Sequence, residues 1–406
     1  MKIFLNKKAR WLLYGLAILV GIFIVYALWE KNWHASDKRK TLAAYATAIL
    51  DECKDKAYRP DCYDKAIPRL MDAISMEEAF EVTRLVQEKD DGYAYCHVLG
   101  HNLSAREAAK DLSLWKSVIA RCPSGMCSNG CLHGAMQERF RGDSLTAEQL
   151  EEAIPDLQNV CEQKQNFNPT GLEQSSCYHA VGHLLMYMTK ADIPLSLTLC
   201  DRVAVKSNGR TYVQVCNDGV FMQMFQPLEP EDFALVKGMA PTKEGLTSYC
   251  STFKGIAHTS CWSEGWPLFW GEVNTPRGLV KFCSTLQETE SRGRCFNAMF
   301  FLLTAQFHLE EGKITEFCNG LPTKALKGTC FANGAARMIE TDAGLIHKSV
   351  ALCATAEVAG VGERCYHELL VYSTFNFHAG GKSFTALCEA LPGAWSRKCF
   401  NREVTN

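Results

Sequence analysis

Residues 318–353 read CNGLPTKALKGTCFANGAARMIETDAGLIHKSVALC and contain the pattern that decides the fold. The stretch begins at one cysteine, passes a second at Cys330, and ends at Cys353, where the next unit begins. Apolar residues recur at three-and-four spacing after Cys330 and before Cys353, which is typical of helices. The segment between Cys318 and Cys330 holds Gly, Pro and Lys and is predicted to be a connection. One unit is therefore expected to contain antiparallel helices joined by short loops.

The same unit recurs along the chain. The first cysteines of four successive units are spaced by 35, 35 and 35 residues, and the second cysteines by 35, 35 and 34. Copies with looser spacing continue upstream. A helical hairpin cannot bury its apolar face alone, so such hairpins must stack. The sequence thus predicts an all-α fold of disulfide-stapled helical-hairpin repeats, an α-solenoid.

The 20 cysteines fit one disulfide scheme. Nine neighbour pairs account for 18 of them and leave Cys96 to pair with Cys127. An exchange among Cys122, Cys127 and Cys131 is an alternative. Together with His133 these three would also make a zinc set, but an exported chain favours disulfides. The predicted bridges are Cys53–Cys62, Cys96–Cys127, Cys122–Cys131, Cys161–Cys177, Cys200–Cys216, Cys250–Cys261, Cys283–Cys295, Cys318–Cys330, Cys353–Cys365 and Cys388–Cys399.

An apolar run precedes the repeats. Residues 11–29 read WLLYGLAILVGIFIVYALW, and these 19 residues hold no charged side chain. At ~1.5 Å per residue they span roughly 28 Å, about the hydrocarbon core of a bilayer. We expect residues 1–10 in the cytoplasm, residues 11–29 as a transmembrane signal anchor, residues 30–42 as a juxtamembrane linker, and residues 43–406 as an extracytoplasmic, cysteine-rich repeat domain. Cleavage after Val25-Tyr26-Ala27, as in a signal peptide, is the alternative.

Charge and motifs narrow the function classes. The 43 basic and 45 acidic residues nearly cancel, so the composition gives no case for nucleic-acid binding. No nucleotide-binding or hydrolase fingerprint stands in a credible context, so an enzyme is not the favoured interpretation. The expected partners are the membrane, through one helix, and a protein or cell-envelope component, on the periplasmic or extracellular side.

Two units carry a resemblance to a known family. CFANGAARMIETDAGLIHKSVALC (residues 330–353) and CHVLGHNLSAREAAKDLSLWKSVIARC (residues 96–122) resemble the cysteine-rich form of Sel1-like, TPR-like helical repeats. The resemblance implies an exported scaffold that binds partners, and some cysteine-rich members are associated with cell-wall-like or β-lactam ligands. It carries over no site residue. The predicted function is a membrane-anchored extracytoplasmic scaffold, with a metal-binding protein or metal-dependent enzyme as the alternative.

Histidines support that alternative. His97 and His101 lie four residues apart, as do His179 and His183, and His133 falls between the pairs. Four-residue spacing puts both imidazoles of a pair on one helix face, which suits a metal with nitrogen ligands such as Zn, Cu or Fe. We expect His133 to be the shared ligand, and binding to weaken as pH falls through ~6, because ligation needs neutral imidazole. The competing hypothesis is that these side chains cap helices and pack.

Aromatic residues make a second candidate site. Trp262, Trp266 and Trp270 recur every four residues, with Glu264 among them. A stripe at helical spacing is usually part of a core. A ligand groove in which the rings stack on a sugar is the functional hypothesis, because Pro267 interrupts the helix there.

The apolar run generates a first prediction. If residues 11–29 remain as an anchor, the mature protein stays in the membrane fraction after an alkaline wash, and protease added from outside reaches its C-terminus. Recovery of a soluble chain that begins near Leu28 would establish cleavage instead.

Overall fold

The computed structural model of the protein describes residues 37–93, 95–140, 145–164, 167–206, 209–228 and 230–402. The predicted cytoplasmic segment and anchor, residues 1–29, lie outside the described part. Among the described residues no helix is both long and apolar enough to cross a membrane. Residues 37–53 form one helix, so regular structure already begins within the predicted linker, residues 30–42.

The described residues are helical, with two isolated β-bridges and no longer strand among them. Each hairpin consists of a first helix, a short loop and a second helix. These first helices are residues 37–53, α3 (Met76–Gln87), α5 (Trp115–Ala120), α7 (Ala147–Val160), α9 (Ile193–Val203), α12 (Leu246–Cys250), α15 (Pro276–Cys283), α17 (Glu311–Asn319), α19 (Ile346–Val358) and α21 (Lys382–Ala390).

The second helix of each hairpin returns antiparallel to the first. These second helices are α2 (Arg59–Arg69), α4 (His97–Ala108), α6 (Gly130–Phe140), α8 (Gly171–Met188), α10 (Val213–Phe225), α13 (Gly255–Glu264), α16 (Thr289–Gln306), α18 (Lys324–Thr341), α20 (Gly362–Asn376) and α22 (Gly393–Asn401). Short elements join them, namely η1 (Leu70–Asp72), η2 (Asp91–Tyr93), η3 (Leu112–Leu114), η4 (Cys127–Asn129), α11 (Pro230–Leu235), η5 (Trp266–Phe269), α14 (Trp270–Val273) and η6 (Ala343–Leu345).

Local sequence explains where several helices begin. Ser75 caps α3 by accepting a hydrogen bond from the backbone N–H of Glu78, whose carboxylate accepts from the N–H of Ser75. Thr170 and Glu173 make the same reciprocal pair at the start of α8. Each such box satisfies two N–H groups that the first turn leaves without helical partners.

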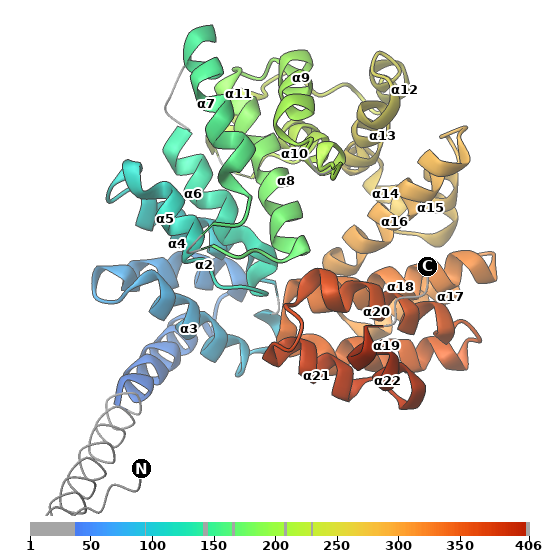
Figure 1. Cartoon of the computed structure of the whole chain (residues 1–406). Coiled ribbons are helices and arrows are strands. Elements are labelled where there is room, and N and C mark those ends of the chain that lie inside the picture. The colour runs from blue at the N-terminus through green and yellow to red at the C-terminus, as the bar shows by residue number, and fades with distance from the viewer. Residues whose placement is uncertain are drawn as a thin grey trace, which may run out of the picture.

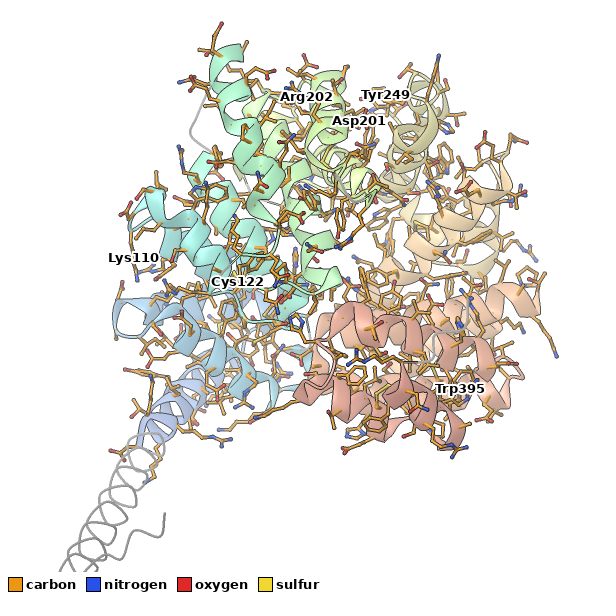
Figure 2. The ribbon with its side chains drawn as sticks, viewed as in Figure 1. Lys110, Cys122, Asp201, Arg202, Tyr249 and Trp395 are labelled. Atoms are coloured by element: carbon orange, nitrogen blue, oxygen red, sulfur yellow. A yellow bond between two sulfur atoms is a disulfide. The ribbon has the colours of Figure 1, made fainter. Side chains whose placement is uncertain are left out.

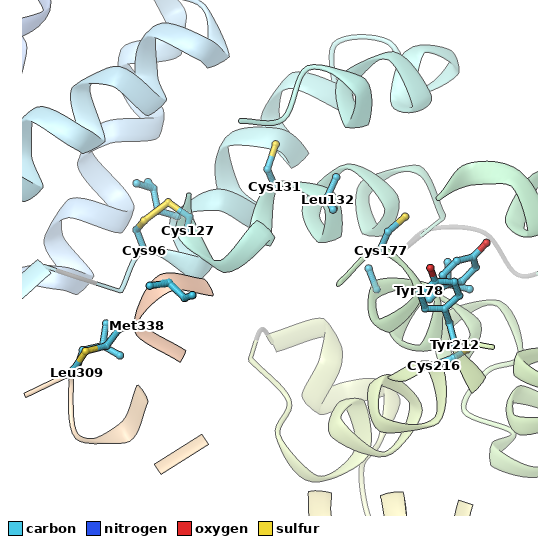
Figure 3. Close-up of a cluster of buried hydrophobic side chains, with 14 of the residues drawn as sticks. Cys96, Cys127, Cys131, Leu132, Cys177, Tyr178, Tyr212, Cys216, Leu309 and Met338 are labelled. Carbon is cyan, nitrogen blue, oxygen red and sulfur yellow. A yellow bond between two sulfur atoms is a disulfide. The ribbon is translucent and has the colours of Figure 1, made fainter. Parts of the chain in front are cut away.

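Ten disulfides cross-link the hairpins, and no described cysteine is free. The pairing agrees with the predicted scheme. Nine bridges join the two helices of one hairpin, and loops of this size give about 3 kcal/mol each on the chain-entropy estimate. The α3–α4 hairpin has no internal disulfide. Its Cys96 is bonded to Cys127 of the next hairpin, and Gln87 occupies the place beside Cys96 where the other hairpins have their first cysteine. Figure 3 shows this bridge.

Second helices pack against one another in chain order, and the arc they form returns on itself. In Figure 1 the helices run from α2 through α10 and α13 to α16, and α20 then lies beside α8. Two hydrogen bonds cross this junction: His378 Nε2 bonds the carbonyl O of Asn168 at 2.9 Å, and the N–H of Ala343 donates to the carbonyl O of Gly125 at 3.3 Å. Residues of the last hairpins therefore border the first ones.

Side chains divide between this packed interior and the surface. Tyr178 of α8 stacks on Tyr212 with ring centroids 4.7 Å apart, and both are buried. Figure 3 includes this pair. Charged residues such as Lys110 and Arg202 are exposed and point outward in Figure 2. The apolar faces expected from the sequence are thus covered by neighbouring hairpins.

Glycines allow two pairs of second helices to approach unusually closely. A Cβ at Gly134 of α6 would overlap the carbonyl O of His101 on α4, and a Cβ at Gly219 of α10 would overlap the carbonyl O of His179 on α8. Any larger residue would force the helices apart. The sequence motifs around these glycines, CLHG and CNDG, are therefore packing devices for α4–α6 and α8–α10.

This contact gives a stability prediction. Gly219→Ala is expected to destabilise the protein by about 1–3 kcal/mol through overpacking, although Ala is the better helix former. Gly293→Ala is the matched control, because Gly293 also lies inside a helix, α16, but has open space at its Cβ. That variant should gain about 0.5–1 kcal/mol. Thermal unfolding of both variants tests this, and equal melting temperatures would contradict the close-packing interpretation.

Candidate metal centre

Five histidines from three successive hairpins converge. The ring centroids of His97, His101 and His133 form a triangle with sides of 4.7, 5.0 and 5.0 Å. His133 also lies 5.7 Å from His179 and 5.8 Å from His183, which are 4.9 Å from each other. The cluster is thus two triangles that share His133. Three ligand nitrogens, one each from His97, His101 and His133, lie within 4.8 Å of one another.

Helix α4 and its neighbour α6 orient the first pair. His97 Nδ1 lies 3.3 Å from the carbonyl O of Cys127, and His101 Nδ1 lies 3.2 Å from Gln137 Oε1. The two Nε2 atoms face each other at 3.0 Å. A carbonyl oxygen can only accept, so Nδ1 of His97 carries the proton and its Nε2 presents a lone pair.

Helices α8 and α10 repeat this arrangement. His179 Nδ1 lies 3.1 Å from the carbonyl O of Val215, and His183 Nδ1 lies 2.7 Å from Gln223 Oε1. The Nε2 atoms of His179 and His183 are 3.1 Å apart. Both pairs therefore combine one backbone acceptor with one glutamine acceptor, all in the next hairpin; the Cys127 carbonyl lies in η4, and the other three acceptors lie on α6 or α10. Acceptors on the far ring nitrogen fix the tautomer and orientation of metal-binding histidines.

The orientation of each glutamine amide determines which ring nitrogens of the paired histidines carry a proton. With Oε1 towards His183, the buried Nε2 of Gln223 has no hydrogen-bond partner among the described residues. The opposite amide orientation would make Gln223 the donor, and His183 Nε2–H would then donate to His179 Nε2. Two hydrogen-bonding schemes therefore fit this geometry: one in which the glutamines accept and the paired Nε2 atoms present lone pairs that could bind a metal, and one in which the glutamines donate and the histidines of a pair bond to each other.

Burial keeps the imidazoles neutral. It lowers the pKa of His97 to about 4, with the nearby charge of Arg337 as the next cause. Burial also lowers the pKa of His133 and His179 well below the usual value, and the other imidazoles of the cluster add to this effect. The pKa of His183 is lowered too, mainly by burial. Neutral imidazole is the form that binds metals.

The last hairpins supply one wall of the site. Tyr95 stacks on His97 with ring centroids 5.9 Å apart, and the guanidinium of Arg337 from α18 lies 5.7 Å from the ring of Tyr95. Arg337 Nη1 donates to Glu340 Oε1 at 2.9 Å. Burial raises the pKa of Glu340 to about 7, against the lowering effect of Arg337. This charged pair reaches the histidines because the arc of helices closes.

Sequence reasoning missed the two glutamines that orient the rings. Gln137 follows Gly134 by three residues in CLHGAMQ, and Gln223 follows Gly219 by four in CNDGVFMQ. The signal was the similarity of these two segments, each one hairpin after an H-x-x-x-H pair. Reading the two-hairpin unit as a duplication would have identified both glutamines.

The tryptophan stripe does not form one exposed face. Trp262 and Trp266 are buried, and Trp262 stacks on Phe282 at 5.1 Å, whereas Trp270 is 39 % exposed. The helix ends at Glu264 as α13, which separates Trp262 from η5 and α14. Glu264 accepts a 2.7 Å hydrogen bond from Gln226, and burial raises its pKa well above the usual value. Two of the three rings thus serve the core, where they cannot stack on a ligand.

No family model matches the chain, and neither the curated proteins nor the solved structures include a match to it. The resemblance to Sel1-like repeats therefore stays a prediction.

The lowered pKa values predict acid sensitivity of the metal-free protein. In the unfolded chain, His97 binds a proton as the pH falls below about 6.5, whereas in the folded protein its pKa is lowered to about 4 and it stays neutral down to that pH. The unfolded state then binds more protons, so the free energy of unfolding falls as pH drops through this window. Metal loss should likewise occur nearer pH 4 than the pH of ~6 expected from an ordinary histidine.

Melting temperatures of the metal-free protein between pH 7 and pH 4 measure this dependence. His133→Leu removes one buried imidazole and should make the pH slope shallower, whereas His347→Ala, at an exposed position of α19, should leave it unchanged. Equal slopes in all three proteins would show that the cluster does not control acid stability.

Proposed function

We propose that this protein is an extracytoplasmic metal-binding protein whose centre holds a transition-metal ion on His97, His101 and His133. The observation that carries the proposal is the first histidine pair, whose Nε2 atoms lie 3.0 Å apart while each Nδ1 faces a carbonyl-type oxygen. Two nitrogens bound at 2.0–2.1 Å to one ion lie about 3.0–3.4 Å apart for bond angles near 95–110°. The spacing of the pair suits two ligands of one ion.

His133 supplies the third ligand in this proposal. Its ring lies 5.0 Å from both partners, and it is buried, with a pKa well below the usual value. Protonation of His133 is therefore unfavourable, whereas a metal ion would gain a bond from each neutral imidazole. Three neutral imidazoles without a thiolate suit zinc, copper or iron. They also leave a coordination position for water or a ligand, as catalytic zinc sites do.

The compartment is consistent with this proposal. Disulfides form and persist in oxidising compartments, so the ten disulfides indicate an extracytoplasmic location. We retain the anchor at residues 11–29 and the solenoid arrangement of the hairpins as parts of the proposal. In this proposal the disulfides stabilise the hairpins, and the histidines bind the metal ion.

A partner-binding scaffold is the second candidate. It is favoured by a cleft of about 660 Å³ where α3 meets the η6 region of the late hairpins. Its lining mixes Phe80 and Met126 with charged side chains such as Arg84 and Lys348. A cleft of this size and mixed character fits a small ligand or a peptide side chain.

Metal analysis of the purified full-length protein tests the main proposal. The wild-type protein should retain zinc, copper or iron in stoichiometric amount, and His133→Ala should abolish retention at the three-histidine site while the hairpins stay folded. His367→Ala is the matched control, because His367 follows Cys365 in α20 as His179 follows Cys177 in α8. It should retain the metal.

Absence of metal binding would contradict the proposal. If protein reloaded with zinc, copper or iron binds none of them, and His133→Ala only lowers the melting temperature, the imidazoles form the hydrogen-bonded network with donating glutamines. The protein would then be a scaffold.

A further inference from the structure

The second histidine pair has no role in the three-histidine site, yet the structure builds it in the same way. Each pair lies one turn apart at the inner face of a second helix, α4 or α8. Each takes one backbone carbonyl and one glutamine Oε1 as acceptors from the next hairpin. The Cys127 carbonyl lies in η4, whereas the acceptors of Gln137, Val215 and Gln223 lie on α6 and α10. With both glutamines accepting, the paired Nε2 atoms face each other as two lone pairs, and a cation between them would remove that repulsion.

We propose that His179 and His183 bind a second transition-metal ion beside the first, with His133 between the two ions. The proposal rests on the proposed function for its choice of ligand chemistry, but its ligands are different residues. The Nε2 separation of 3.1 Å falls in the same range of about 3.0–3.4 Å expected for two ligands of one ion.

The two sites are not equivalent, because the two similar segments differ at the position of the third ligand. Asp218 in CNDG of α10 occupies the position that His133 occupies in CLHG of α6. The Asp218 carboxyl lies near Glu264 of the next hairpin, where its charge adds to burial in raising the pKa of Glu264. His133 is also farther from the second pair, at 5.7 and 5.8 Å, than from the first. The second ion therefore has two close protein ligands where the first has three.

Fewer protein ligands have two chemical consequences. The second ion binds more weakly than the first, and it keeps more positions for exchangeable ligands such as water. The second ion would thus offer more open coordination positions than the first. The pair Arg337–Glu340 lies close enough for Arg337 to lower the pKa of both His97 and His179.

Copper(II) is the probe for the test, because electron paramagnetic resonance reports both nitrogen ligation and proximity of two ions. The full chain, stripped of metal with a chelator, is titrated with copper(II). Two ions per chain should bind, the second with lower affinity, and the spectrum should broaden as the second site fills because the ions are neighbours. His179→Ala/His183→Ala should bind one ion with a sharp, isolated spectrum.

Glutamine variants keep the test decisive if the histidine variants fold poorly. Gln223→Leu removes the acceptor of His183 but no ligand, and should weaken only the second ion, by about 10–100-fold. Gln137→Leu is the matched variant of the first pair and should weaken only the first ion. Both glutamines are buried, so the two substitutions disturb packing alike.

The outcomes separate the two proposals. Binding of one ion by the wild-type chain, with the same stoichiometry in His179→Ala/His183→Ala, overturns the second site and leaves the first intact. Binding of no copper by any variant overturns both. A Gln223→Leu protein that loses the first ion as readily as the second would also contradict separate sites.

Discussion

Close approach of neighbouring second helices is the constraint on which the rest of the structure depends. Packed helices usually keep their axes 8–10 Å apart, since side chains fill the space between them. At Gly134 and Gly219 the missing side chain lets a helix lie directly on the carbonyls of His101 and His179. Across α4–α6 the rings of His97 and His101 then meet His133, and across α8–α10 the second pair meets its acceptors on Val215 and Gln223. A bulkier residue at Gly134 would separate α4 from α6 and move His133 away from His97 and His101, whereas one at Gly219 would move α10 and its Gln223 away from the second pair.

Electrostatics makes the cluster suitable for ligation and unsuitable for protonation. Burial disfavours charged imidazole, and Arg337 adds a positive charge at the edge of the site. That charge opposes any cation, and the bonded carboxylate of Glu340 offsets part of it. In the proposed site, several neutral nitrogens would bind one metal ion at once, and these bonds would offset the remaining repulsion. A proton forms only one such bond.

The bridge between Cys96 and Cys127 connects the disulfide framework to the histidines. It joins the residue before His97 to η4, where Cys127, Ser128 and Asn129 all adopt positive φ values of 52°, 46° and 57°. Consecutive left-handed residues other than glycine are costly and persist only where surrounding contacts hold them. Here the bridge and the contact of His97 with the Cys127 carbonyl hold them, so the strained segment orients a candidate ligand.

The sequence by itself determined the hairpins and their cross-links. A period of 35 residues and three-and-four apolar spacing act locally, so they fix helices and bring each cysteine near its neighbour. The sequence also placed His97 beside His101, and His179 beside His183, because four residues make about one helical turn. Only the tertiary structure decided that the two pairs meet around His133, that Gln137 and Gln223 orient them, and that Trp262 and Trp266 are buried. These outcomes depend on how closely helices from different repeats cross and on closure of the arc, and contacts between distant residues leave no local period in the sequence.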